Sequence, residues 1–302
     1  MTLLNEYLKS TFGCKVYKIA LNGGFTCPNR DGTLDSRGCI FCSAGGSGEF
    51  AGNPTESITE QIEAGKQKVS AKIKDGKYIA YFQAYTGTYA PVERLEKLYR
   101  EAIGHPDIAA LSIATRPDCL PDDVLDLLAD LNKEKPVWVE LGLQTIHEQT
   151  ARYILRGYPL NIYDEAVDNL RKRNIEVITH VILGLPGEGE EDMLDTIRYV
   201  CGLPVGSKYV PHALHATGIK LQLLHILKGT DLEKNYREGL VTPLSEDEYI
   251  NLLKKCTALI PDDVVIHRLT GDGDKKLLIA PLWSADKKHV WNRIQREVLS
   301  RD

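Results

Sequence analysis

The sequence predicts an α/β protein, a partial (β/α)6 TIM-like barrel with a C-terminal α/β extension. Short apolar runs alternate with amphipathic stretches from about residue 16 onward, the pattern of parallel strands joined by crossover helices. Polar and glycine-rich residues follow each apolar run, where a parallel barrel carries its functional groups. The chain has 302 residues, enough for one large domain and a short appendage, and no apolar run approaches the length of a membrane span.

Six apolar runs predict the strands of the barrel. Stretches of helical periodicity lie between them, and Pro121 followed by Asp122 is typical of a helix start. Asn161 is placed to cap the helix that follows it. The predicted strands span residues 16–21, 78–82, 109–114, 137–143, 177–183 and 219–224, and the predicted helices span residues 56–74, 92–103, 121–131, 163–173 and 190–201.

Residues 1–230 form the predicted barrel core, with a cysteine-bearing loop at 22–48. The alternation weakens after that, so residues 231–302 are predicted as an extension with helices near 246–259 and 287–299. The formal charge of −5 gives no overall basic surface of the kind that binds nucleic acid. Between residues 275 and 302, however, seven Lys/Arg stand against three Asp/Glu, which fits either a solvated helix or one that contacts RNA.

Three cysteines near the start of the chain, Cys27, Cys39 and Cys42, form the most informative motif. Three thiolates leave one iron of a four-iron cluster open to a substrate or cofactor. Cys39 and Cys42 also have the spacing of a zinc site, but no histidine precedes His105 to complete a Cys3His set. The total of seven cysteines is odd and nothing at the N-terminus resembles a secretory leader, so disulfides are disfavoured and a cytoplasmic location is expected. The triplet therefore favours an iron–sulfur cluster over structural zinc.

An open iron at a barrel mouth suits S-adenosylmethionine, whose methionine amine and carboxylate can chelate the metal. The strand ends offer exposed backbone for the ammonium, arginine for the carboxylate, polar side chains for the ribose and a glycine-rich loop for adenine. Taken singly, each of these residues also has an ordinary structural explanation. The candidate cofactor contacts are Tyr85, Thr86, Gly87, Arg116, Glu140, Gln144, Arg156, Gly184 and Leu185.

The chain resembles the radical S-adenosylmethionine superfamily, in the branch that holds oxygen-independent coproporphyrinogen oxidase and the elongator catalytic subunit. The Cys39-Ile40-Phe41-Cys42 pair, with an aromatic residue before its last cysteine, is like the cluster loop of that superfamily. More closely, the chain resembles the small bacterial family typified by YhcC and YtqA. The gap from Cys27 to Cys39 is longer than in most of the superfamily, and Thr86-Gly87-Thr88 stands where Gly-Gly-Glu is usual. The matching stretches are residues 23–32, 81–86, 115–119, 140–144, 184–189 and 220–229.

This resemblance implies a [4Fe-4S] cluster on Cys27, Cys39 and Cys42, S-adenosylmethionine as cofactor, and an external reductant such as flavodoxin or ferredoxin. In the MnmL-like branch it implies action on the wobble uridine of tRNA, whose carboxymethylaminomethyl side chain is taken to the aminomethyl form. The base would flip out of its stack into the barrel mouth, where aromatic and basic groups could hold it. The residues considered for that role are Tyr85, Tyr89, His225 and the basic C-terminal helix.

Two alternatives remain open on the residues alone. A radical S-adenosylmethionine enzyme with a small-molecule substrate would suit the acidic overall charge equally well. A zinc-stabilised RNA-binding module without catalysis would use the same cysteines for structure.

Overall fold

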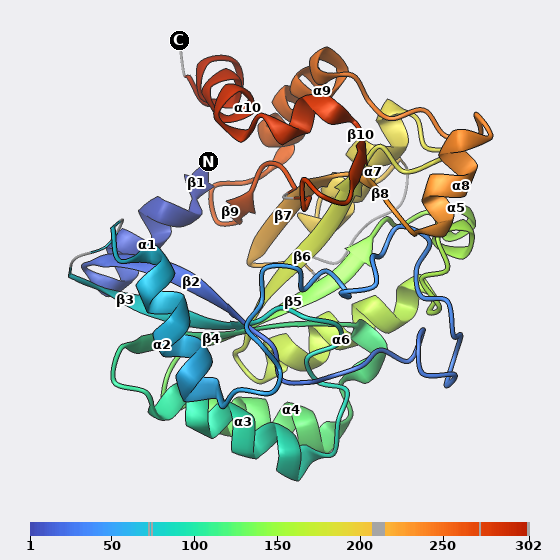
Figure 1. Cartoon of the computed structure of the whole chain (residues 1–302). Helices are drawn as coiled ribbons and strands as arrows, with labels where there is room; N and C mark the ends of the chain where they lie inside the picture. Colours follow the sequence, from blue (N-terminus) through green and yellow to red (C-terminus); the bar gives the residue numbers. More distant parts are fainter. Residues whose placement is uncertain (72, 74, 207–214, 272, 301–302) are drawn as a thin grey trace.

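The chain folds around one eight-stranded parallel sheet that curls into a partial barrel, as seen in the computed structural model of residues 1–71, 73, 75–206, 215–271 and 273–300 (Figure 1). Neighbours in the sheet follow the order β1-β9-β7-β6-β5-β4-β3-β2, and every pairing is parallel. The prediction of a partial TIM-like barrel is confirmed. The strands are β1 (Thr2–Leu3), β2 (Lys15–Leu21), β3 (Gly76–Phe82), β4 (Ile108–Thr115), β5 (Val137–Gln144), β6 (Glu176–Leu183), β7 (Gly218–Leu223) and β9 (Val265–Arg268).

The sheet is wider than the six predicted strands. All six are present within about two residues of their expected bounds. The additional strands are β1, which has only two residues, and β9, which has four and pairs with both β7 and β1. Segments this short carry no readable alternation, so periodicity could not reveal them. Residues on both sides of position 230 thus contribute to the sheet, and the division of the chain there stays a prediction.

Helices cover the outer face of the sheet, as crossover connections require. Ser57 caps the start of α2, because its side chain accepts from the Glu60 backbone N–H while the Glu60 carboxylate accepts from the Ser57 backbone N–H. Asp122 begins α4 directly after Pro121, whereas Asn161 lies inside α6 rather than at its cap, because that helix already starts after Pro159. The barrel helices are α2 (Ile58–Val69), α3 (Val92–Gly104), α4 (Asp122–Asn132), α5 (Glu148–Tyr153), α6 (Leu160–Lys172) and α7 (Glu190–Val200).

The C-terminal part adds helices and one strand of a small two-stranded sheet. The structure places α9 and α10 where two helices were predicted, with an apolar strand between them. A two-stranded antiparallel pair, β8 with β10, lies beside the barrel mouth. Within the described residues, no helix is both long and apolar enough to cross a membrane. The bounds are α8 (Asp231–Arg237), α9 (Glu246–Leu259), α10 (Lys287–Ile294), β8 (Ile226–Leu227) and β10 (Leu278–Ala280).

The barrel interior is built in layers, because alternate residues of each strand point inward. At the N-terminal end of the strands the inward residues are apolar, and α1 (Leu4–Phe12) closes that end by packing Leu8 against them. One step up each strand the inward residues become polar, which is unusual for a barrel core. The apolar layer consists of Val16, Ile79, Ala110, Trp138 and Ile178, and the polar layer of Lys18, Tyr81, Ser112, Glu140, His180 and Lys220.

Candidate active site

The loop from β2 to α2 brings the three cysteines to the mouth of the barrel. Cys42 closes a tight turn by donating its backbone N–H to the Cys39 carbonyl at 2.9 Å. Arg30 stabilises that turn, because its guanidinium donates to the carbonyls of Cys42 at 2.9 Å and Ser43 at 2.6 Å. The buried Asn29 amide donates to the Cys39 sulfur at 3.5 Å and to the Leu155 carbonyl at 2.7 Å. The loop is therefore tied both to itself and to the segment after α5.

The spacing of the three sulfurs fits a cluster better than a single zinc ion. Tetrahedral zinc with Zn–S bonds near 2.3 Å brings its sulfurs to about 3.8 Å from one another. The Sγ atoms of Cys27, Cys39 and Cys42 do not all lie within 4.8 Å of one another. The sulfurs nevertheless influence one another electrostatically. Burial raises the pKa of Cys39 to about 12, and the neighbouring Cys42 sulfur adds to this rise. Thiols in this setting stay protonated unless a metal centre neutralises the thiolates.

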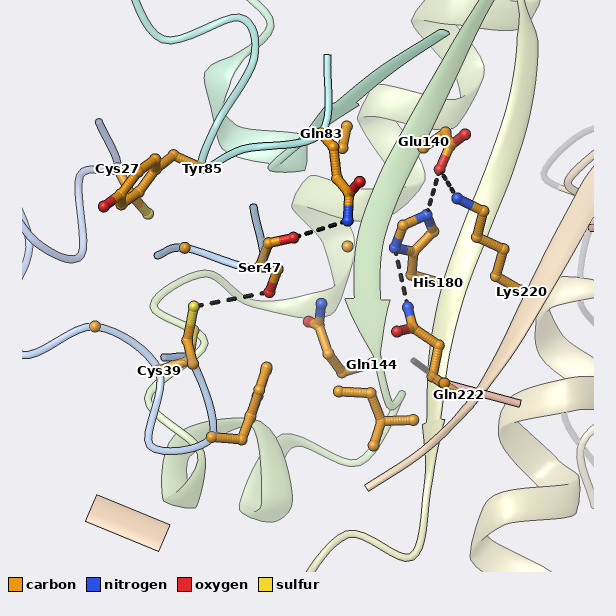
Figure 2. Close-up of a pocket in the computed structure, with 18 of the residues that line it drawn as sticks. Cys27, Cys39, Ser47, Gln83, Tyr85, Glu140, Gln144, His180, Lys220 and Gln222 are labelled. Carbon is orange, nitrogen blue, oxygen red and sulfur yellow. Dashed lines mark hydrogen bonds and ion pairs between the residues drawn. The ribbon is translucent and has the colours of Figure 1, made fainter. Parts of the chain in front are cut away.

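A cavity of about 250 Å³ opens between the cysteine loop and the polar layer of the barrel. The three cysteines line one wall of it, which we call the upper wall, and Glu140, His180 and Lys220 line part of the side towards the barrel interior, which we call the floor. Figure 2 shows Cys27 and Cys39 across the cavity from Glu140, His180 and Lys220. Gln83 and Gln144 project from the strand ends between these two sets of side chains, and Gln222 lies beside His180 (Figure 2). A molecule bound to the cysteine loop would thus face a buried, charged barrel interior.

Glu140 is the centre of that floor, which we call the Glu140 network: Lys18, Ser112, Glu140, His180 and Lys220. Glu140 Oε1 accepts from Lys18 Nζ at 2.5 Å and from Ser112 Oγ at 2.6 Å. Its Oε2 pairs with His180 Nε2 at 2.8 Å and with the Lys220 ammonium. His180 and Lys220 face each other directly on β6 and β7, so the strand register itself places both beside the carboxylate.

The Glu140 network carries more positive than negative charge. Burial alone would raise the pKa of Glu140, but the ammonium groups of Lys18 and Lys220 outweigh it and hold the pKa well below its usual value. Burial lowers the pKa of Lys220 to about 7 despite the adjacent carboxylate, because Lys18 and Arg268 add positive charge nearby. Burial, followed by the Lys220 charge, lowers the pKa of His180 to about 4, so the imidazole is neutral. An anion entering this site would relieve the cationic excess.

Comparison with known proteins decides the family. The profile of the Radical SAM superfamily matches residues 27–200, and that of the Radical_SAM C-terminal domain matches residues 216–299. The chain belongs to the radical SAM superfamily. The uncharacterized protein YtqA of Bacillus subtilis is 48% identical over 99% of this chain and 89% of its own length, which places the chain in the YhcC and YtqA family.

More distant likenesses point to the elongator-like branch of the radical SAM superfamily. A protein of Dehalococcoides mccartyi named tRNA uridine(34) acetyltransferase is 29% identical over 73% of this chain, which spans 46% of that protein. The structure of Methanocaldococcus infernus Elp3 has the same fold, with a TM-score of 0.67 and 17% identity over 94% of this chain and 64% of the other. Membership of the radical SAM superfamily implies an iron–sulfur cluster and S-adenosylmethionine as cofactors, and three cysteines lining one cavity fit such a cluster.

Six of the nine predicted cofactor contacts of this radical SAM protein line the cavity, and three do not. Gly87 is held away by backbone bonding to Ala114, with its carbonyl accepting from the Tyr99 hydroxyl. Gly184 packs near Leu244, and Leu185 is buried in a separate apolar group with Ile40. These three do not reach the cavity in this structure. The six that do are Tyr85, Thr86, Arg116, Glu140, Gln144 and Arg156.

The two predicted carboxylate contacts are already engaged by the protein. Arg116 holds Asp118 in a two-pronged pair at 2.9 and 2.7 Å and donates to the Arg156 carbonyl at 2.8 Å. Arg156 is almost wholly buried and donates to the carbonyls of Thr145 at 2.6 Å and Tyr158 at 3.0 Å. Both guanidinium groups also lie over the Tyr158 ring. Arg156 therefore holds the end of β5 in place, and contact with the cofactor stays a prediction for both arginines.

Replacing Arg156 separates these two roles. We expect Arg156→Met to lower the free energy of unfolding by about 3 kcal/mol, because buried carbonyls lose their donors. Urea unfolding of the purified protein measures this loss. Unchanged stability together with weaker S-adenosylmethionine binding would instead make Arg156 a cofactor ligand.

The sequence interpretation missed most residues that shape this site. Their signal was nevertheless present: each is a polar residue within an otherwise apolar strand, or an amide or guanidinium inside the cysteine loop. Of the residues considered for base binding, Tyr85 and His225 line the cavity, whereas Tyr89 lies elsewhere, bonded to Thr33 at 2.9 Å. The residues missed are Lys18, Asn29, Arg30, Ser112, His180 and Lys220.

Proposed function

We propose that this radical SAM enzyme modifies the wobble uridine of tRNA, taking a carboxymethylaminomethyl side chain to the aminomethyl form. The observation that carries the proposal is the cationic excess of the Glu140 network beside the cysteine loop, a setting for a substrate that bears a carboxylate. The likeness to a protein named tRNA uridine(34) acetyltransferase supports the nucleoside and its position. Proposed partners are tRNA and an external reductant such as flavodoxin or ferredoxin.

The cofactors would lie at the upper wall of the cavity and the substrate below them. Cys27, Cys39 and Cys42 would hold a [4Fe-4S] cluster, and the cavity lining beside it, including Thr86 and Gln144, would hold S-adenosylmethionine. When bound, this pair supplies a 5′-deoxyadenosyl radical able to take a hydrogen atom from a carbon next to nitrogen. The reaction balances if that carbon then gives up one electron, which would return to the cluster, and takes up water, so that the C–N bond breaks, the two carbons leave as glyoxylate and the nitrogen stays on the base as the amine. The protein's share is to orient that carbon towards the cofactor and to exclude water.

The floor of the cavity would orient the substrate through its carboxylate. Lys220 lines the cavity with Tyr81, whose ring lies 4.6 Å from the Lys220 ammonium. A substrate carboxylate on Lys220 would place the adjacent carbon and nitrogen above the barrel floor, between floor and cofactor. Gln222 donates towards His180 Nδ1 at 3.2 Å, which orients the neutral imidazole towards Glu140.

Substrate recognition by this route depends on pH. The pKa of Lys220 is about 7 before an anion binds, so its positive charge is present below pH 7 and is lost as the pH rises. We expect kcat/KM for tRNA to fall by up to about tenfold per pH unit above 7, while cofactor cleavage without tRNA changes much less. Steady-state kinetics across this range measure both. A Lys220→Arg variant, charged throughout, should lose this pH dependence.

A small-molecule substrate is the second candidate, because the cavity volume of about 250 Å³ is small. Mass profiling of tRNA nucleosides from cells lacking this gene separates the two. The proposed function predicts that the carboxymethylaminomethyl nucleoside accumulates and that the gene restores the normal pattern. An unchanged tRNA profile, with altered small metabolites instead, would favour the second candidate.

A further inference from the structure

The barrel has an unclosed side, and a second cavity of about 900 Å³ lies there. Within the described part of the chain, the sheet ends at β2, which pairs with β3 on one side only, and at β1, which pairs with β9 on one side only. The helix α1 connects these two edges and contacts both β2 and β9 (Figure 1). We call this second cavity the seam cavity. It is lined by residues of α1, the edge strand β2, β9, the loop residue Phe50 and the first residue of α10.

The seam cavity is strongly basic although the whole chain is acidic. Among the described residues that line it there are six lysines or arginines and no aspartate or glutamate. Lys18 and Lys220 line its inner end, where they pair with Glu140, and Lys9, Lys15 and Lys287 are exposed at its outer rim. Charge of one sign in a concave surface attracts polyanions well beyond contact distance. The basic residues are Lys9, Lys15, Lys18, Lys220, Arg268 and Lys287.

Aromatic rings accompany these charges. Phe50 is 49% exposed, an unusual position for a phenylalanine, and the Lys287 ammonium lies 5.4 Å from the centre of its ring. Tyr17 and Tyr81 line the same cavity, and Lys15 lies over the Tyr17 ring. Basic groups that follow a backbone, combined with rings on which bases stack, are the features of single-stranded nucleic-acid sites.

The seam cavity adjoins the cavity under the cysteine loop. Both are lined by Phe50, Tyr81, Gln83, Lys220 and Arg268. A nucleotide in the seam cavity would therefore lie against Lys18 and Lys220 of the Glu140 network, on the side away from the cysteine loop. A folded acidic protein could meet only the rim lysines, because the route to Lys220 is a concave passage.

The basic C-terminal helix contributes less than its composition indicates. Arg293 is paired with Glu246, Asp247 and Glu297, and Arg296 with Glu297, so their charge is largely neutralised within the protein. Lys287 at the start of α10 is the residue of this helix that lines the seam cavity. The side of the barrel, rather than the face of α10, concentrates positive charge next to the site.

We propose that the seam cavity is the entry for single-stranded RNA, with Lys9, Lys15 and Lys287 on backbone phosphates and Phe50 stacked on a base. This inference rests on the proposed function for the identity of the RNA, and it adds the surface and the direction of approach. The flipped base enters along the free edge of β2, and the carboxymethylaminomethyl side chain of that base ends at Lys220.

The test compares two triple charge reversals in the cluster-loaded protein. One carries Lys9→Glu, Lys15→Glu and Lys287→Glu. The matched control carries Lys133→Glu, Lys172→Glu and Lys234→Glu, exposed lysines away from the seam cavity, with side chains 77%, 67% and 74% exposed. Binding of tRNA and of a uridine-rich single-stranded RNA is measured against salt concentration, and iron content is recorded on the same samples. Phe50→Ala is tested alongside.

The seam variant should bind both RNAs at least about tenfold more weakly than the control, and its slope of log affinity against log salt should fall by about three. Phe50→Ala should lose about tenfold in affinity with no change in slope. Equal binding by seam and control variants would overturn the inference, as would an absence of RNA binding by the unmodified protein. Loss of reduction by flavodoxin, with RNA binding intact, would assign the surface to an acidic protein instead.

These outcomes separate the entry surface from the proposed reaction. If the wobble nucleoside is converted equally by seam and control variants, the reaction stands and the entry surface is wrong. If RNA binding depends on the seam cavity but no wobble nucleoside changes, the entry surface stands and the reaction is wrong.

Discussion

Cys42→Ala should abolish the iron–sulfur cluster and lower cleavage of S-adenosylmethionine by more than about a hundredfold. Two thiolates cannot hold four irons in place, so the remaining Cys27 and Cys39 would not retain the cluster. Arg30 and Asn29 would keep the loop folded, because their bonds go to backbone carbonyls that the substitution leaves intact. Iron analysis, the visible absorption of the anaerobic protein and product analysis measure the effect.

Cys14→Ala is the matched control for this prediction. Cys14 is partly exposed at the start of β2, in the seam lining rather than at the cysteine loop. It should keep about four irons per chain. Full cofactor cleavage by Cys42→Ala, or a colourless parent protein with one zinc, would contradict the assignment of the cysteine ligands.

Glu140→Gln should lower the free energy of unfolding by about 3–5 kcal/mol, the usual cost of breaking a buried ion pair by removing one partner. The substitution keeps the shape of the side chain but leaves the Lys18 and Lys220 ammonium groups buried without a counter-charge. The loss should be larger at pH 6 than at pH 9, because Lys220 can shed its proton at the higher pH. Urea unfolding at the two pH values measures both effects.

Two comparisons make this result specific to the Glu140 network. Glu134→Gln removes an exposed partner of Arg100 and should change stability far less, since solvent screens that pair. The double variant Glu140→Gln with Lys220→Met should recover part of the loss, because one unpaired cation disappears. A loss in Glu140→Gln no larger than in Glu134→Gln would show that the buried carboxylate is not what balances these lysines.

The sequence predicted the barrel well because its signals are local. Each of the six long strands is a predominantly apolar run, and the helix start at Pro121 and Asp122 carries a signal of its own, because proline suits the first turn of a helix. The two additional strands have two and four residues, and they exist only through pairing across the fold. Non-local pairing of this kind leaves no periodic pattern to read.

The residues of the candidate site show the same difference between local and non-local signals. The cysteine triplet could be read from spacing, because the ligands lie within one loop. The Glu140 network draws one residue from each of five strands, β2, β4, β5, β6 and β7, so only the strand register reveals that they meet. Arg156 shows what the sequence leaves out: an arginine after a strand suits a cofactor carboxylate, which stays a prediction, and the structure adds that its guanidinium also donates to backbone carbonyls at the end of β5.

The reaction itself offers the most direct test of the proposed function. The cluster-loaded protein is incubated without oxygen with S-adenosylmethionine, a reductant, and tRNA whose wobble carboxymethylaminomethyl group carries deuterium on the carbon between nitrogen and carboxylate. The account predicts that the wobble nucleoside loses its carboxymethyl unit while deuterium appears in 5′-deoxyadenosine. An unchanged wobble nucleoside, with free cleavage of the cofactor and no deuterium transfer, would contradict it.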